Sequence, residues 1–182
     1  MVRTSAAEDD LTGGLVTREL HLSYTILPPS ENEIRELQWV RKGGRPKAVG
    51  MHYTAEADGY RKDFREYMRT HYMVEIQKFR KTHKPWHAYR VWIQFYFPAE
   101  EILNKGWLNS VKTRAKTPYK KMDVGNRRKL LEDCIAAAID IDDSLSFDLE
   151  MTKFVSTEPL IEIFIAEEDP SFFGIPTDYL RG

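Results

Sequence analysis

The chain has 182 residues, 42% of them hydrophobic and 12% aromatic, which suits one domain with a sizeable core. Its single cysteine, Cys134, excludes a disulfide framework and a cysteine-rich zinc site. The first residues include Glu8, Asp9 and Asp10 without an apolar run, and no segment approaches the ~20 apolar residues of a membrane span. We therefore expect a cytoplasmic protein without a membrane partner.

The net charge of −1 conceals a strong segregation of charge along the chain. Residues 1–40 hold 3 basic and 7 acidic side chains, residues 41–130 hold 22 and 8, and residues 131–182 hold 2 and 13. A middle section of net charge +14 can attract a polyanion although the whole chain is nearly neutral. This pattern favours contact with nucleic acid over a surface whose charges merely neutralise one another.

The composition divides the chain into three parts. Residues 1–17 are small and polar, which predicts a disordered N-terminal tail. Residues 18–169 contain the periodic segments and are expected to form a single domain. Residues 170–182 form a C-terminal tail.

The first half of the domain predicts one strand and one helix. Residues 19–27 alternate between apolar and polar side chains, and prolines at 28 and 29 end this strand. Residues 31–52, with Gly43-Gly44 near their centre, are expected to be a long, mobile and basic connection. Thr54 is a favourable N-cap for a helix that runs to about Arg80.

The second half of the domain predicts three strands and one helix. Residues 89–97 form a strand rich in β-branched and aromatic side chains, and residues 98–121 are a second basic connection. Apolar residues at helical spacing predict a helix over residues 124–139. Residues 147–155 and 160–166 are two further strands. The order β-α-β-α-β-β predicts an α+β (mixed α/β) fold with a small mixed sheet and two main helices.

Acidic residues flank the second predicted helix on both sides. Asp123 lies just before it, and Asp142 and Asp143 follow it. If these carboxylates meet, they can hold Mg²⁺, with Mn²⁺ as a substitute, and the metal can assist hydrolysis of a phosphodiester. Asp123 as a helix cap and the aspartate pair as turn residues are the simpler alternatives.

Lys129 lies three residues after Asn126 and four before Asp133, on one face of the predicted helix. A lysine in this position can bind the scissile phosphate or stabilise its developing charge. The alternative is a surface ion pair with Asp133.

Basic segments on both sides of the acidic residues are the expected DNA contacts. They can bind phosphates without reading base sequence. The predicted DNA-binding residues are Arg41, Lys42, Arg45, Lys47, Lys112, Arg114, Lys116, Lys120, Lys121, Asn126 and Arg127.

Two groups of residues resemble the RusA-type Holliday junction resolvases. The first is Pro28-Pro29-Ser30-Glu31-Asn32, followed by a basic glycine-containing loop, Thr54-Ala55-Glu56 and Tyr60-Arg61. The second is Asp123-x-x-Asn126-x-x-Lys129-x-x-x-Asp133, followed by Asp142-Asp143. The resemblance covers roughly residues 20–166.

The resemblance implies an endodeoxyribonuclease that acts in recombination or repair. It implies a homodimer that binds four-way DNA junctions and other branched DNA and cuts symmetrically with Mg²⁺. Asp123 and Asp143 would be catalytic, metal-binding acids and Lys129 would assist catalysis. Asp142 precedes the second acid, and Asp133 is a further candidate ligand.

Gly125 departs from the family pattern. The usual motif reads Asp-x-Asp-Asn, whereas this chain reads Asp123-Val124-Gly125-Asn126, so one expected carboxylate is missing. Glu132 or Asp133, on the same helix, could compensate. The alternative function is therefore a catalytically impaired, dimeric junction-binding protein.

Overall fold

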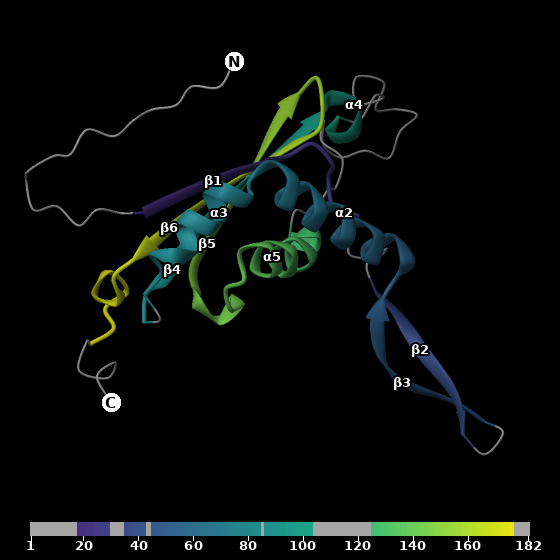
Figure 1. Ribbon diagram of the computed structural model, residues 1–182. Coiled ribbons are helices and arrows are strands. Elements are labelled where there is room, and N and C mark those ends of the chain that lie inside the picture. The colour runs from purple at the N-terminus through teal and green to yellow at the C-terminus, as the bar shows by residue number, and fades with distance from the viewer. Residues whose placement is uncertain (1–17, 30–34, 43–44, 85, 104–124, 177–182) are drawn as a thin grey trace, which may run out of the picture.

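The computed structural model describes residues 18–29, 35–42, 45–84, 86–103 and 125–176 (Figure 1). The predicted N-terminal tail and most of the second basic connection lie outside the described residues.

A four-stranded mixed sheet forms the centre of the fold. Its strands are β1 (Arg18–Tyr24), β4 (Ala88–Pro98), β5 (Ser146–Ser156) and β6 (Leu160–Glu168), in the order β1-β6-β4-β5. β6 pairs antiparallel with β1 and with β4, whereas β4 and β5 are parallel. The parallel pair requires a crossover, which contains the second main helix. The predicted mixed sheet is confirmed.

Helices cover one face of this sheet (Figure 1). They are α2 (Ala55–His71), α3 (Met73–Lys81) and α5 (Gly125–Ile139). The short α4 (Ala99–Ile102) follows β4, and the 3₁₀ turns η2 (Asp143–Leu145) and η3 (Pro170–Phe173) flank the last two strands. No helix in the described part of the chain is both long and apolar enough to cross a membrane.

The core lies between the helices and the alternate residues of each strand. In β6, Ile161, Ile163 and Ile165 are fully buried, and Leu130 and Leu131 of α5 are buried in the same cluster. The period-two pattern that predicted the strands and the helical pattern that predicted α5 both place apolar side chains in this core.

The first predicted helix is interrupted at Tyr72, which separates α2 from α3. Tyr72 has φ −129° and ψ 12°, outside the helical region. Its hydroxyl accepts from the backbone N–H of Ser23 at 3.1 Å and lies 2.6 Å from the Ser23 hydroxyl oxygen. This tertiary contact with β1 accompanies a break that the apolar periodicity did not predict.

The segment 31–52 was expected to be a long, mobile and basic connection, and the prediction of a connection without strands is wrong. Most of it forms β2 (Arg35–Lys42) and the greater part of β3 (Arg45–Tyr53), an antiparallel pair that makes a separate two-stranded sheet. The pair projects from the body as an arm (Figure 1). A Gly-Gly pair between two extended segments is a known hairpin signal, and here it separates the two strands.

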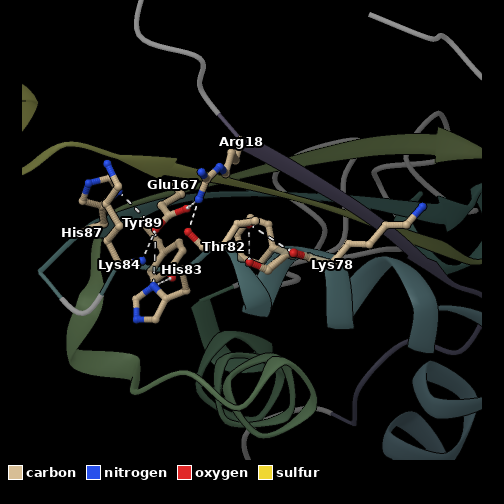
Figure 2. A network of polar contacts seen from close by, with 9 residues as sticks. Arg18, Lys78, Thr82, His83, Lys84, His87, Tyr89 and Glu167 are labelled. Atoms are coloured by element: carbon tan, nitrogen blue, oxygen red, sulfur yellow. Dashed lines mark hydrogen bonds and ion pairs between the residues drawn. The ribbon is translucent and has the colours of Figure 1, made fainter.

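A buried carboxylate joins several elements at one end of the main sheet (Figure 2). Glu167 is 5% exposed and accepts a hydrogen bond from the backbone N–H of Lys84 at 2.9 Å. Arg18 Nη1 lies 3.5 Å from one of its oxygens, and His87 Nδ1 lies 3.1 Å from the other. These contacts tie β1, β6 and the segment before β4 together.

Candidate active site

Helix α5 carries two of the candidate catalytic or metal-binding residues, Lys129 and Asp133. Its buried side chains fix its orientation against the sheet, and it ends where Asp140 adopts a left-handed conformation with φ 55°. The N–H of Ile141 then donates to the carbonyl of Ala136 at 3.1 Å, which closes the C-terminus. This turn leads the chain into Asp142 and η2 at the start of β5.

Asp142 is an exposed carboxylate in this turn. Its Oδ1 accepts a hydrogen bond from the backbone N–H of Ser144 at 2.9 Å. Hydrogen bonds from Ser144, through its side chain and its backbone, hold the pKa of Asp142 below its usual value. Asp142 is therefore an ionised, accessible oxygen donor. Asp143 begins η2, and its side chain lies outside the described part of the structure.

The two ends of α5 are far apart. The helix has 15 residues, and a rise of 1.5 Å per residue separates its first and last Cα atoms by about 21 Å. Asp123, which precedes the helix in the sequence, lies outside the described residues, as does the side chain of Asn126. Among the described residues, no group of three or more His, Cys, Asp or Glu side chains could hold a metal ion.

Lys129 and Asp133 form an ion pair on α5. Lys129 Nζ lies 2.9 Å from Asp133 Oδ1, and the lysine side chain is 53% exposed. The hydroxyl of Tyr53, at the end of β3, donates to the other oxygen of Asp133. Tyr53 was not among the predicted site residues, since nothing in the sequence joins positions 80 residues apart.

Asp133 is held in its ionised form. Burial raises its pKa, but the hydrogen bonds from Tyr53 and Lys129 and the charges of Lys129 and Arg61 outweigh burial and leave the pKa below its usual value. Both carboxylate oxygens already have protein partners. Asp133 thus joins the base of the hairpin to α5.

Glu132 lies on a different side of the helix. It pairs with Arg128 at 3.1 Å. It also lines a small, mainly apolar cavity of about 40 Å³ together with Asp142, Ile135 and Leu149. Of the two acids that could compensate for Gly125, Glu132 therefore shares a cavity with Asp142.

Arg127, a predicted DNA contact, is partly buried in the first turn of α5. Its Nη1 donates to the carbonyl of Pro28 at 2.6 Å, and its guanidinium lies 5.6 Å from the ring centre of Phe97. Arg127 thereby fastens the Pro28-Pro29 segment to the N-terminal end of α5.

A groove of about 570 Å³ lies beside this arginine. The acidic residues Glu56, Asp63 and Glu101 line it together with Tyr60 and Arg127. Burial raises the pKa of Tyr60 well above its usual value, so the phenol remains a neutral hydroxyl that donates to the carbonyl of Ile26. Glu56 and Asp63 come from α2 and Glu101 from α4, and none of the three was predicted as a site residue.

The predicted basic residues fall into two groups. The first group lies in the distal part of the projecting arm and consists of Arg41, Lys42, Arg45 and Lys47. The register of β2 and β3 places Lys42 opposite Arg45 and Val40 opposite Lys47. The second group lies outside the described residues: Lys112, Arg114, Lys116, Lys120 and Lys121.

Comparison with known proteins gives one family. The model of the endodeoxyribonuclease RusA family matches residues 28–166, which spans the arm, α2 to α5, β5 and most of β6. No curated protein sequence matches the chain significantly. The match covers well over half of the 182 residues. The chain therefore belongs to the RusA endodeoxyribonuclease family.

Proposed function

We propose that this protein is a Mg²⁺-dependent, structure-selective endodeoxyribonuclease that resolves Holliday junctions and other branched DNA during recombination or repair. The observation that carries the proposal is the match of residues 28–166 to the RusA endodeoxyribonuclease family. The family acts on four-way junctions and generally depends on a divalent metal. The cytoplasm is the proposed place of action.

The donor chemistry near α5 suits a hard cation. Asp142 presents an exposed, ionised carboxylate, and the neighbouring Asp143 and the preceding Asp123 are the other proposed ligands. A bound Mg²⁺ would lower the pKa of a water molecule and offset charge on the phosphate. Asp133 is the weakest candidate ligand, because both of its oxygens have partners.

The remaining residues bind and orient the DNA in this proposal. Lys129 extends an exposed ammonium group from α5 and can neutralise a phosphate while Asp133 holds its side chain. The basic arm supplies phosphate contacts away from the catalytic residues.

We further infer that the active form is a homodimer. The first and last Cα atoms of α5, which lies between these acids in the sequence, are about 21 Å apart. In a symmetric dimer, two antiparallel copies of α5 would place the start of one beside the end of the other. The carboxylates of two copies could then share one metal.

The direct test is cleavage of a labelled four-way junction with Mg²⁺ or Mn²⁺. The proposal expects symmetric nicks that require the metal and that Asp143→Asn abolishes. Asp140→Asn is the control, since it makes the same chemical change three residues away and an asparagine tolerates the left-handed conformation. Equal activity of Asp143→Asn and the parent protein would reject the proposed catalytic role.

A second function follows from Gly125, the first residue of α5. Because glycine offers no carboxylate where the family pattern has aspartate, the protein could bind junctions without cutting them. This alternative expects tight binding that a chelator does not weaken, and no product with any metal.

Restoring the missing acid separates the two functions. If the site lacks only this ligand, Gly125→Asp creates or raises metal-dependent cleavage, while Gly125→Asn, of nearly the same size, does not. No gain with Gly125→Asp would reject the missing-ligand explanation.

A further inference from the structure

The main sheet has a second face, opposite α2, α3 and α5, that is rich in aromatic side chains. One row across the four strands reads His21, Phe164, Trp92 and Glu150. His21 stacks on Phe164 with 4.2 Å between ring centres. All four side chains are partly or fully exposed. This row offers flat rings to a ligand rather than an apolar surface for a helix.

The same face is acidic. The strand register places several carboxylates on it. These are Glu19, Asp148, Glu150, Glu162 and Glu168. The basic side chains that the register of these strands places on this face are Arg90 and the exposed His21. Aromatic rows on open sheets can stack nucleic-acid bases, but carboxylates repel the phosphates that accompany those bases. The charge therefore favours a cationic ligand.

Arg90 shows how this face holds a guanidinium. Its Cζ lies 4.6 Å from the ring centre of Trp92 and 4.9 Å from that of Phe172. Its Nε lies 3.1 Å from Asp148, and Nη1 lies 3.8 Å from Glu168. Stacking on rings with carboxylates at the edge is the arrangement that selects arginine over lysine.

A groove beside Trp92 repeats this combination of rings and carboxylates, and Arg90, whose guanidinium lies over Trp92, is not among the residues that line it. It measures about 310 Å³ and is lined by Trp92 and Phe164, with Glu19 and Glu150 at its sides. Neither glutamate forms an ion pair with a described residue. We propose that this groove binds an arginine-rich segment of a protein partner, with a guanidinium stacked on Trp92 and carboxylates beside it.

The spacing of the two glutamates defines the ligand further. Glu19 lies on β1 and Glu150 on β5, three strand spacings apart across the sheet and two residues apart along the strands, or about 16 Å. An extended peptide covers about 3.4 Å per residue, so basic residues about four to five positions apart span this distance. The groove thus suits an extended peptide that crosses the strands and carries repeated arginines.

The test uses a fluorescein-labelled hexa-arginine peptide and fluorescence anisotropy on the full chain. We expect saturable binding that weakens about tenfold in Trp92→Ala and about threefold in Glu150→Gln, in keeping with a cation–π contact and an exposed ion pair. Glu158→Gln, in the exposed turn after β5, carries the same charge change and should leave affinity unchanged. Hexalysine should bind more weakly than hexa-arginine.

Glu150→Lys provides a second variant at an exposed position, where folding is not at risk. It should abolish binding of the peptide. Equal weakening by Glu158→Gln and Glu150→Gln would show diffuse charge attraction and overturn the proposal. The proposal would also be overturned if the parent protein bound an oligothymidine and Trp92→Ala lost that binding. A change of oligomeric state in Trp92→Ala would likewise overturn it. These results do not depend on cleavage of DNA.

Discussion

The Asp133 carboxylate connects the arm to α5 through its two partners. One oxygen pairs with Lys129 on the same helix, and the other accepts from Tyr53 at the end of β3. The first contact is the surface ion pair that the spacing along the helix predicted as an alternative to phosphate binding. The second connects the arm to α5, and only the fold reveals it.

Tyr53→Phe tests this connection. Removing the hydroxyl takes away one interaction that lowers the pKa of Asp133, so that pKa should rise towards its ordinary value. A hydrogen bond to a carboxylate contributes about 1.5–3 kcal/mol, and the partial exposure of Asp133 places the expected loss of stability at or below the lower end.

The pH dependence of this loss has a defined sign. A depressed folded-state pKa stabilises the protein above the unfolded pKa of about 3.9, and that stability is lost as the pH falls through the folded pKa. Tyr53→Phe should therefore destabilise at neutral pH and match the parent in strong acid, as measured by urea unfolding at several pH values. Tyr96→Phe, whose hydroxyl donates to Glu162, is the control that should leave the pKa of Asp133 unchanged. An unchanged Asp133 pKa in Tyr53→Phe would contradict the argument.

The buried carboxylate of Glu167, at one end of the main sheet, is expected to contribute to stability. Glu167→Gln removes the charge and leaves only one carbonyl oxygen for Lys84, Arg18 and the histidines. Leaving buried polar groups unpaired costs about 1–3 kcal/mol, so the midpoint of thermal unfolding should fall. Glu168→Gln, next in the strand and 3.8 Å from Arg90, should change stability by less than about 1 kcal/mol. Equal effects of the two substitutions, measured by calorimetry, would contradict a special role of Glu167.

At the scale of elements, the apolar periodicity of the sequence predicted the helix and strands whose side chains form the core. Helix α5 and the four strands of the main sheet bury one set of side chains, so their apolar spacing is visible in the sequence. The arm has no such constraint, since its strands pair only with each other in a separate sheet. Beside the Gly43-Gly44 turn signal, its strands carry only short apolar alternation, such as Leu37-Gln38-Trp39 and Val49-Gly50-Met51. Likewise, no local signal marks the break at Tyr72, because its partner is in β1.

The arm also carries a prediction. Arg45→Ala combined with Lys47→Ala should leave the thermal midpoint unchanged, because the arm lies outside the main sheet. Each lost phosphate contact should reduce the slope of log affinity against log salt by about 0.9 on duplex DNA. Lys78→Ala combined with Lys81→Ala, on α3, is the control with the same loss of charge. Equal salt slopes for the arm variant and the parent would show that the arm does not contact DNA.

At the scale of the molecule, the segregation of charge along the chain becomes a separation in space. The basic middle section, residues 41–130, contributes the basic side chains of the distal arm. The acidic section, residues 131–182, forms β5 and β6 and contributes many of the carboxylates on the sheet face opposite the helices. A polyanion approaching the molecule is attracted to one region and repelled from another. The near-zero net charge therefore hides two surfaces with opposite preferences.

The length of α5 leads to a prediction about the whole assembly. If the acids at its two ends meet only across a symmetric dimer, Asp123→Asn and Asp143→Asn proteins are each inactive, yet a mixture is active. One site of each heterodimer then combines an intact Asp123 with an intact Asp143, so random exchange restores about a quarter of all sites. A nicking assay on a four-way junction should show single nicks without paired cuts. Activity absent from the mixture, with subunit exchange verified by mass spectrometry, would place all ligands in one chain. A monomer in sedimentation at all concentrations would reject the dimer itself.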